Sequence, residues 1–206
     1  MTEQTLSLFD FEAVPDRTVA PLGRAEAQRF IERWHYSGRC PTGKNIFFGG
    51  YINGELYCVS DYGIGVNAYQ SSFLSRETGH VVTDSNLLEL KRLCRSEPRQ
   101  NWPLTQFLSQ CHKTLKAQGY KYIVSFSDPE HGHNGGIYRA ANFQHIGQSS
   151  PEFHLVDENG EKRHRRYAFR YARRNGIDVA EARDRLGVSR QKTAPKDRWF
   201  LCISKK

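Results

Sequence analysis

The sequence predicts one mixed α/β domain with a largely antiparallel sheet and flanking helices. An amphipathic helical pattern comes first, two apolar segments then surround Asn53-Gly54, and later strand patterns alternate with helical ones. The length of 206 residues suffices for one well-cored domain. We expect residues 1–22 to form an N-terminal tail and residues 23–206 to form the domain, with a basic C-terminal segment at 161–198.

The first half of the domain is expected to contain a helix, a hairpin and a further strand. Residues 24–34 place apolar side chains at i, i+3, i+4 and i+7 from Ala27, which is the pattern of an amphipathic helix. Asn53-Gly54 predicts a type I′ turn between the strands NIFFGGYI and ELYCVSDYG. The short apolar segment 87–95 is expected to be another strand.

The second half alternates helices and strands. We expect a helix capped by Asn101, with Pro103 in its first turn and Gly119 at its end. The segment YKYIVSFS predicts a buried strand, and a helix at 134–142 follows it. Further strands are expected in FQHIGQSSPEFHLV, with a hairpin at DENGEK, and the domain closes with the strand DRWFLCIS. A capping box at Asp178 predicts one more helix before that last strand.

Positive charge is concentrated near the C-terminus. From residue 161 onward there are 15 Lys/Arg and 5 Asp/Glu, whereas the whole chain carries +8. Aromatic residues are interleaved with the arginines, and such side chains stack on bases. This pattern predicts a polyanionic partner, which we interpret as nucleic acid, and a solvated basic tail is the alternative. The candidate DNA-binding residues are Arg163, Arg165, Arg166, Arg170, Arg173 and Arg174.

Other bulk features limit the class of protein. The chain has no run of 18 apolar residues, so we expect no membrane span, and its start lacks the apolar core of a signal peptide. Its five cysteines form no CxxC pair, which favours reduced thiols in the cytoplasm. The N-terminal segment EQTLSLFDF resembles peptides that dock on the bacterial sliding clamp, here through Gln4, Leu6, Leu8 and Phe9. A hydrophobic staple or an edge strand is the alternative there.

The segment SDPEHGHNGGIYRAANF (127–143) joins a strand to a helix. Asp128 follows the buried strand, and a glycine pair opens the next helix. Ligands of α/β sheets bind beyond the carboxyl ends of strands, where helix amides attract anions. We therefore expect a pocket here. A metal site on His131 and His133 is the weaker alternative, because HxH in a glycine-rich loop has low specificity.

This segment also resembles the strand-helix-strand part of the GNAT N-acetyltransferase fold. Within that fold, the ordered pieces of this chain resemble the Mom family, the adenine-modification proteins of Mu-like phages. Those pieces are WHYSG (34–38), LKRL (90–93), NWPLTQFLS (101–109), the stretch 124–147, KRHRR (162–166) and KDRWF (196–200). The resemblance implies transfer of a carbamoylmethyl-type group to the exocyclic N6 amine of adenine in duplex DNA, in a bacterial host cell. It implies functional roles for His35, Tyr36, Arg92, Thr105, Asp128 and Tyr138, although the family favours serine at the position of Thr105.

Three of these residues each have an expected chemical role and a structural alternative. Asp128 would accept a hydrogen bond from the amine or act as a base, unless it only caps the following helix. Tyr138 would donate to a leaving group or orient a donor, unless it only packs on the sheet. Arg92 lies in an apolar strand, so its partner is expected to be a substrate anion or a carboxylate such as Glu89.

The donor of the transferred group stays unknown at this point. GNAT enzymes hold coenzyme A with an R/Q-x-x-G-x-G/A loop, whereas the equivalent RSEPRQNWP has no glycine. Arg95, Arg99 and Asn101 are its candidate cofactor-binding residues. Acetyl-CoA or another acyl donor is possible, and so is an iron site on His35, Tyr36 and Asp128. The alternative functions are a GNAT acetyltransferase for a protein or small-molecule amine, and a non-catalytic DNA-binding module.

Overall fold

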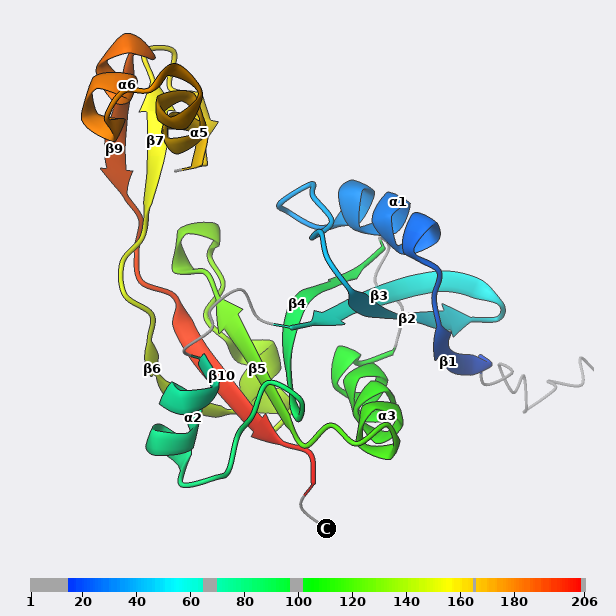
Figure 1. Ribbon diagram of the computed structural model, residues 1–206. Helices are drawn as coiled ribbons and strands as arrows, with labels where there is room; N and C mark the ends of the chain where they lie inside the picture. Colours follow the sequence, from blue (N-terminus) through cyan, green and yellow to red (C-terminus); the bar gives the residue numbers. More distant parts are fainter. Residues whose placement is uncertain (1–14, 65–69, 97–101, 165, 205–206) are drawn as a thin grey trace, which may run out of the picture. The chain divides into compact units, whose positions relative to one another are not determined.

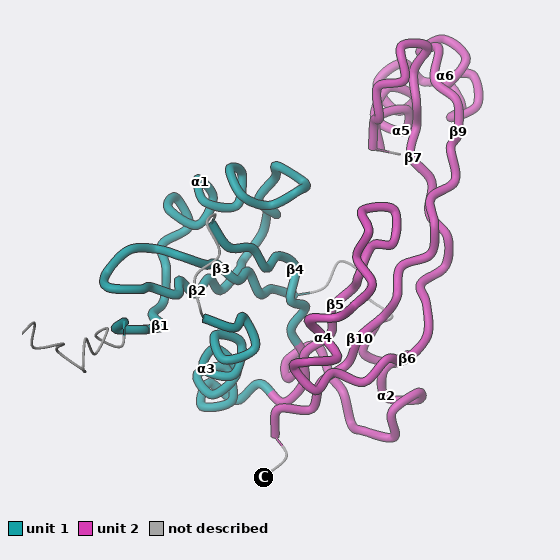
Figure 2. Tube along the Cα trace, turned by 180° about the vertical axis from the view of Figure 1, so that it is seen from behind, with its two compact units in different colours: residues 1–68, 88–120 teal, residues 69–87, 121–206 magenta. Residues whose placement is uncertain are grey.

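Two compact units make up the protein. The computed structural model describes residues 15–64, 70–96, 102–164 and 166–204. Unit 1 comprises residues 1–68 and 88–120, and unit 2 comprises residues 69–87 and 121–206 (Figure 2). Each unit has its own set of strands and its own apolar cluster.

Unit 1 is an antiparallel sheet with a helix on each face. Its strands are, in order across the sheet, β1 (Arg17–Pro21), β2 (Asn45–Ile52), β3 (Glu55–Gly63) and β4 (Leu87–Arg95). α1 (Arg24–Trp34) packs its apolar side on one face, against Phe47 and Val59 (Figure 1). On the other face, α3 (Leu104–Ala117) places the Sγ atom of Cys111 3.6 Å from the Oγ atom of Ser60.

Unit 2 is built around three antiparallel strands in the order β5 (Tyr122–Ser127), β10 (Asp197–Cys202) and β6 (Gln144–Gln148). The short helices η1 (Pro129–His131) and α4 (Gly136–Ala140) follow β5. α2 (Gln70–Thr78) packs Leu74 into the apolar cluster of this unit, beside Val124 and Phe200.

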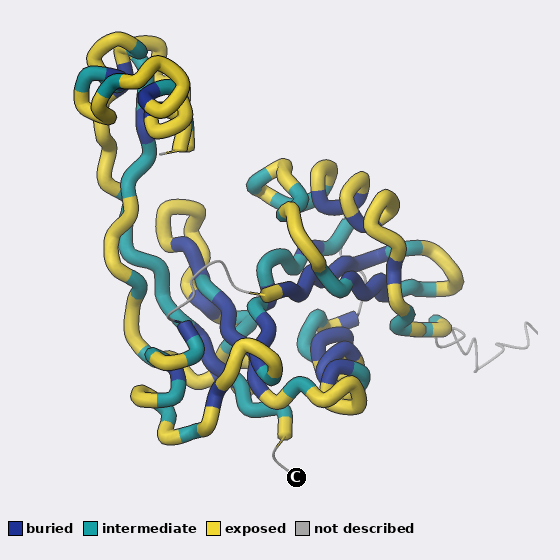
Figure 3. Tube along the Cα trace, in the orientation of Figure 1, coloured by how far each residue is buried: buried dark blue, intermediate teal, exposed yellow. Residues whose placement is uncertain are grey.

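The chain between β6 and β10 forms a small sheet-and-helix body, which we call the insertion (residues 153–192). It contains β7 (Phe153–Asp157), β8 (Lys162–Arg163), α5 (Arg166–Asn175), α6 (Val179–Arg185) and β9 (Val188–Lys192). Its antiparallel strands are ordered β8-β7-β9, and its core consists of Leu155, Ala168 and Val188 with two partly buried neighbours. Most residues of the insertion are exposed (Figure 3).

The predicted mixed α/β class with a largely antiparallel sheet is confirmed. α1 has the predicted bounds, and Asn53 and Gly54 have φ values of 51° and 83°, as a type I′ turn requires. The predicted helix at 134–142 is shorter, because the left-handed residues Gly135 (φ 73°) and Asn142 (φ 62°) bound it.

Other expectations were incomplete. Residues 17–21, which we assigned to the tail, form β1 and pair with β2. Pro103 occupies the N-cap position of α3 instead of its first turn, and Asn101 lies outside the described residues. The helices α2 and α5 were not predicted, because neither buries enough large apolar side chains to give a helical period; α5 buries only Ala168 and Ala172.

Gly135 is required by its contact with Trp199 as well as by its backbone conformation. A Cβ atom at this position would overlap Cζ2 of Trp199. We expect Gly135→Ala to lower the free energy of unfolding by about 2–4 kcal/mol, which combines left-handed strain with overpacking. Gly79→Ala is the matched control, since Gly79 also has a positive φ (69°) but has no atom within 4 Å of the added Cβ. Urea unfolding measures both variants. An equal loss of unfolding free energy in Gly135→Ala and Gly79→Ala would show that the contact with Trp199 adds nothing.

Candidate active site

Asp128 lies directly after β5, and a backbone hydrogen bond and an ion pair hold its side chain in place. Its Oδ1 atom accepts a hydrogen bond from the backbone N–H of Glu130 at 3.1 Å, which caps η1. Its Oδ2 atom lies 3.0 Å from Nζ of Lys196. Partial burial alone raises the pKa of Asp128, but Lys196, the Glu130 N–H and nearby His131 outweigh burial and hold that pKa below its ordinary value. Asp128 is therefore a charged hydrogen-bond acceptor and a weak base.

Tyr138 reaches the same end of β5 from α4. Its hydroxyl accepts a hydrogen bond from Oγ of Ser125 at 2.8 Å and donates to the carbonyl of Phe126 at 3.4 Å. Its ring stacks on Trp199, with centroids 5.7 Å apart and an interplanar angle of 22°. The fold thus brings the predicted pair Asp128 and Tyr138 to one strand end within unit 2.

The two loop histidines do not complete a metal site in the described part of the chain. The rings of His131 and His133 lie 6.3 Å apart, and both residues are exposed. Burial and the neighbouring His131 lower the pKa of His133, although Asp128 opposes them. Among the described residues, no group of three or more His, Cys, Asp or Glu side chains has a geometry suited to a metal ion.

The remaining catalytic candidates belong to unit 1. His35 caps the end of α1, its Nδ1 atom lies 2.8 Å from Oγ of Ser37, and its ring lies 4.3 Å from that of Tyr36. Tyr36 is 51% exposed. The guanidinium of Arg92 donates to the carbonyl of Arg39 at 3.2 Å and to that of Lys91 at 2.7 Å. Arg92 therefore binds one backbone carbonyl of the loop after α1 and one of its own strand, and this was not anticipated.

Thr105 and the cofactor candidates lie around the start of α3. Thr105 is half-buried in the first turn of α3, and Arg95 ends β4. Arg99 and Asn101 lie outside the described residues. The segment 95–103 has no glycine and contains two prolines, which lack the N–H group that a pyrophosphate cradle uses. This segment does not fit the coenzyme A loop of GNAT enzymes.

Asp61 is a buried carboxylate that the sequence analysis missed. It is 0% exposed in β3, and its Oδ2 atom accepts a hydrogen bond from Nδ2 of Asn45 at 3.2 Å. Its Oδ1 atom has no hydrogen-bond partner among the described residues. Burial raises the pKa of Asp61 to about 6, although Lys91 and Arg92 oppose this. The one signal in the sequence was an acidic residue in the interior of a strand that is rich in apolar residues.

The raised pKa of Asp61 predicts a pH-dependent stability. Between its ordinary pKa of 3.8 and about 6, the folded chain holds a proton that the unfolded chain has lost. The free energy of unfolding therefore falls as the pH rises through this window, and a pKa difference of about two corresponds to about 3 kcal/mol. We expect Asp61→Asn to remove this loss, as measured by urea unfolding at about pH 4 and pH 7. The control Asp84→Asn should keep the wild-type pH dependence of stability. If Asp61→Asn keeps it as well, Asp61 is not its source.

The insertion presents a basic face on α5. Arg166, Arg170 and Arg173 lie at helical spacing on exposed positions, and Phe169, which is 55% exposed, lies among them. None of these three arginines has a carboxylate partner in the described residues. Arg163 differs from them, because it pairs with Glu161 at 2.5 Å. We call Arg166, Phe169, Arg170 and Arg173 the α5 face.

Two further predicted residues complete the set. Arg174 is exposed in the last turn of α5, and Arg165 lies outside the described residues.

The sliding-clamp segment at residues 4–9 also lies outside the described residues. No helix in the described ranges has the length and apolar character needed to cross a membrane.

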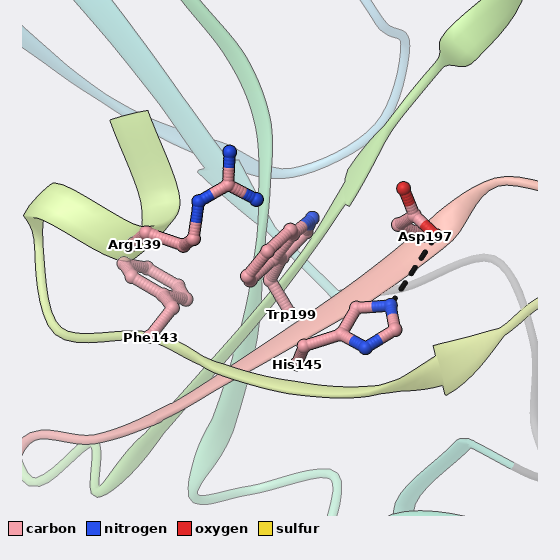
Figure 4. A pocket seen from close by; sticks show the side chains of 5 residues that line it. All are labelled: Arg139, Phe143, His145, Asp197 and Trp199. Carbon is pink, nitrogen blue, oxygen red and sulfur yellow. Dashed lines mark hydrogen bonds and ion pairs between the residues drawn. The ribbon is translucent and has the colours of Figure 1, made fainter. Parts of the chain in front are cut away.

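An open pocket lies between α4 and the strands β6 and β10. It has a volume of about 470 Å³, and Figure 4 shows its lining. The residues that line it are Arg139, Phe143, His145, Asp197 and Trp199. We predicted a pocket near this helix, but none of these five side chains was among the candidates.

A protein-family model for the Mom protein family matches residues 16–206. The chain belongs to the Mom family. It is 23% identical over 133 residues to the methylcarbamoylase Mom of Escherichia phage Mu, covering 64% of this chain and 54% of that protein. The match therefore spans about half of the length of the phage Mu protein.

Solved structures show the fold of this Mom family member. The ribosomal-protein-S18-alanine N-acetyltransferase of Escherichia coli superposes with a TM-score of 0.50 and 11% identity, over 93% of this chain and 96% of the other. An N-acetyltransferase of Staphylococcus aureus Mu50 gives the same TM-score and identity over 92% and 99%. The GNAT acetyltransferase fold is thereby confirmed, and at this identity the likeness concerns the fold alone.

Proposed function

We propose that this protein is a transferase that adds a carbamoylmethyl-type group to the exocyclic N6 amine of adenine in duplex DNA. The observation that carries this proposal is the Mom family match over residues 16–206, which includes the insertion as well as both units. The related phage Mu protein is a methylcarbamoylase by name. The exposed basic α5 face and the polar groups at the end of β5 support the same reading.

In this proposal, Asp128 orients the adenine amine. The lone pair of that amine is delocalised into the ring, so the reaction depends on correct positioning of the nitrogen. A carboxylate at the end of β5 would accept one amine hydrogen. Because the Lys196 ammonium and the Glu130 N–H keep Asp128 ionised, it serves as an acceptor over the whole physiological pH range and is poorly suited to remove a proton.

Tyr138 provides a hydroxyl at the same strand end. Its bond from Ser125 fixes the hydroxyl oxygen, and its own proton points to the Phe126 carbonyl over a long 3.4 Å contact. A substrate oxygen would replace that weak contact with a shorter hydrogen bond. We therefore assign to Tyr138 the donation of a hydrogen bond to the transferred group or to its leaving group.

In unit 1, Arg92 acts as a positioning residue. Its hydrogen bond to the carbonyl of Arg39 fixes the loop that follows His35 and Tyr36. The exposed Tyr36 ring and the His35 ring beside it are then available to contact substrate. Thr105 would supply the hydroxyl that the family carries as serine.

The α5 face would hold the DNA backbone. Arginine side chains without carboxylate partners neutralise phosphates, and an exposed phenylalanine among them would contact sugars or bases. The adenine amine of a duplex is poorly accessible to an enzyme inside the stack, so the target base would be flipped out at a cost of a few kcal/mol. Phosphate contacts on α5 offset that cost.

Nucleoside analysis of DNA from bacteria that express the protein tests this proposal. A modified deoxyadenosine supports DNA modification. An acetylated protein or small-molecule amine together with unmodified DNA would instead support the acetyltransferase alternative. DNA binding with no product of either kind would support a non-catalytic module.

A further inference from the structure

We propose that the pocket lined by Arg139, Phe143, His145, Asp197 and Trp199 holds a nucleobase that carries an exocyclic amine. This inference rests on the proposed function and concerns a base of the bound DNA other than the adenine whose amine Asp128 orients. The volume of about 470 Å³ lies within the range of small-ligand pockets, which is about 300–1,000 Å³.

The floor of the pocket is rigid and flat. The indole of Trp199 is 3% exposed, and its Nε1–H donates to Oγ of Ser127 at 2.9 Å. Tyr138 stacks against it, and Gly135 permits the close approach of the neighbouring backbone. The indole is thereby held in one orientation.

Two exposed planar groups form the walls over this floor. The guanidinium of Arg139 lies 5.6 Å from the Trp199 centroid, and the His145 ring lies 5.0 Å from it (Figure 4). Guanidinium and imidazole planes both stack on unpaired bases in nucleic-acid complexes. A flat aromatic ligand is therefore the class that these walls accept.

The polar edge of the pocket presents acceptors. Oδ1 of Asp197 binds Nε2 of His145 at 3.2 Å and Nε2 of Gln148 at 3.0 Å. Oδ2 of Asp197 has no partner in the described part of the chain. An acceptor at this edge matches an N–H donor of an amino group, which adenine has and thymine lacks.

The pocket lies where the insertion joins the rest of unit 2. His145 and Gln148 come from β6, which leads into the insertion, and Asp197 begins β10, which follows it. The two connecting segments are joined between Ser149 and Lys196, through hydrogen bonds of 2.8 and 3.0 Å. A strand of DNA bound to the insertion would thus lie on a body whose two connecting segments carry His145 and Asp197.

The test compares single-stranded oligonucleotides that differ only in the amine. One is oligo-deoxyadenosine, and the other carries unsubstituted purine deoxyribosides, which have the same ring without the amine. We expect the wild type to bind the adenine oligonucleotide about tenfold more tightly, a typical effect of one well-placed base contact. Asp197→Asn and His145→Phe should each reduce the preference to less than about twofold.

The controls separate base reading from folding and from backbone binding. Asp84→Asn, a matched change on an exposed turn of the same unit, should keep the preference. His145→Phe keeps a flat ring on Trp199, so it guards against an effect of misfolding in Asp197→Asn. The absence of any preference in the wild type, or a preference retained by both variants, would overturn the proposal. If the protein prefers the adenine oligonucleotide but makes no modified nucleoside, the pocket proposal is supported and the transferase function is rejected. If it modifies DNA but shows no preference, the transferase function is supported and the pocket proposal is rejected.

Discussion

Asp128→Asn is expected to abolish DNA modification while the protein stays folded. The asparagine oxygen still accepts the Glu130 N–H and caps η1, but the side chain no longer carries the charge that faces Lys196. The ion pair is partly exposed, so its loss costs about 1 kcal/mol or less. Loss of the group that orients the amine should reduce the rate by about 10²–10⁴-fold. The amount of modified nucleoside and the melting temperature measure the two effects.

Lys196→Met distinguishes catalysis from structure at this position. It breaks the same ion pair but leaves the Asp128 carboxylate in place. If Asp128 acts on the substrate, Lys196→Met retains more modification than Asp128→Asn, and its activity declines at low pH because the pKa of Asp128 rises without Lys196. Equal losses in the two variants would mean that Asp128 only supports the loop. Tyr138→Phe should also lose modification, since the ring still stacks on Trp199 but the hydroxyl is gone.

Reversing the charge of the α5 face is expected to weaken binding to duplex DNA of every sequence alike. The variant changes Arg166, Arg170 and Arg173 to glutamate on one side of α5. Phosphate contacts carry no base information, so the loss should not depend on sequence. Each lost contact should also reduce the slope of log K against log salt by about 0.9. Binding of both proteins across a salt series measures affinity and slope together.

A charge-matched control removes the effect of net charge. Changing Lys113, Lys116 and Lys121 to glutamate alters the net charge equally, at exposed positions outside the insertion. This control should keep the wild-type slope and most of the affinity. If the control and the α5 variant lose binding equally, the DNA contacts lie elsewhere and the α5 face is a solvated surface.

Local patterns were sufficient to predict elements whose cause is local. The period of apolar residues predicted α1, and Asn53-Gly54 predicted the turn between β2 and β3. By contrast, α5 buries only alanines toward the insertion core, and its aromatic residues Tyr167 and Phe169 are exposed. Apolar periodicity therefore gave no signal for it. The insertion as a separate body could not be predicted either, because its strands β7 and β9 are far apart in the sequence.

Only the part of the site that lies on one continuous segment of the sequence was predictable. Asp128 and Tyr138 lie ten residues apart around one loop, and the strand-loop-helix pattern placed Asp128 after the strand and Tyr138 in the following helix. Asp61 could not be recognised, since its unpartnered oxygen depends on burial between strands. Likewise, the base-reading proposal depends on the pairing of β6 with β10, which brings His145 to Asp197.

Mass spectrometry of nucleosides from DNA of bacteria that express the protein shows whether adenine is modified. We expect a deoxyadenosine derivative heavier by one carbamoylmethyl group in place of one hydrogen, with the added mass on the base fragment. Cells that express Asp128→Asn should contain only the unmodified nucleoside. Unmodified deoxyadenosine in cells with abundant, folded wild-type protein would contradict the account, as would added mass on any base other than adenine.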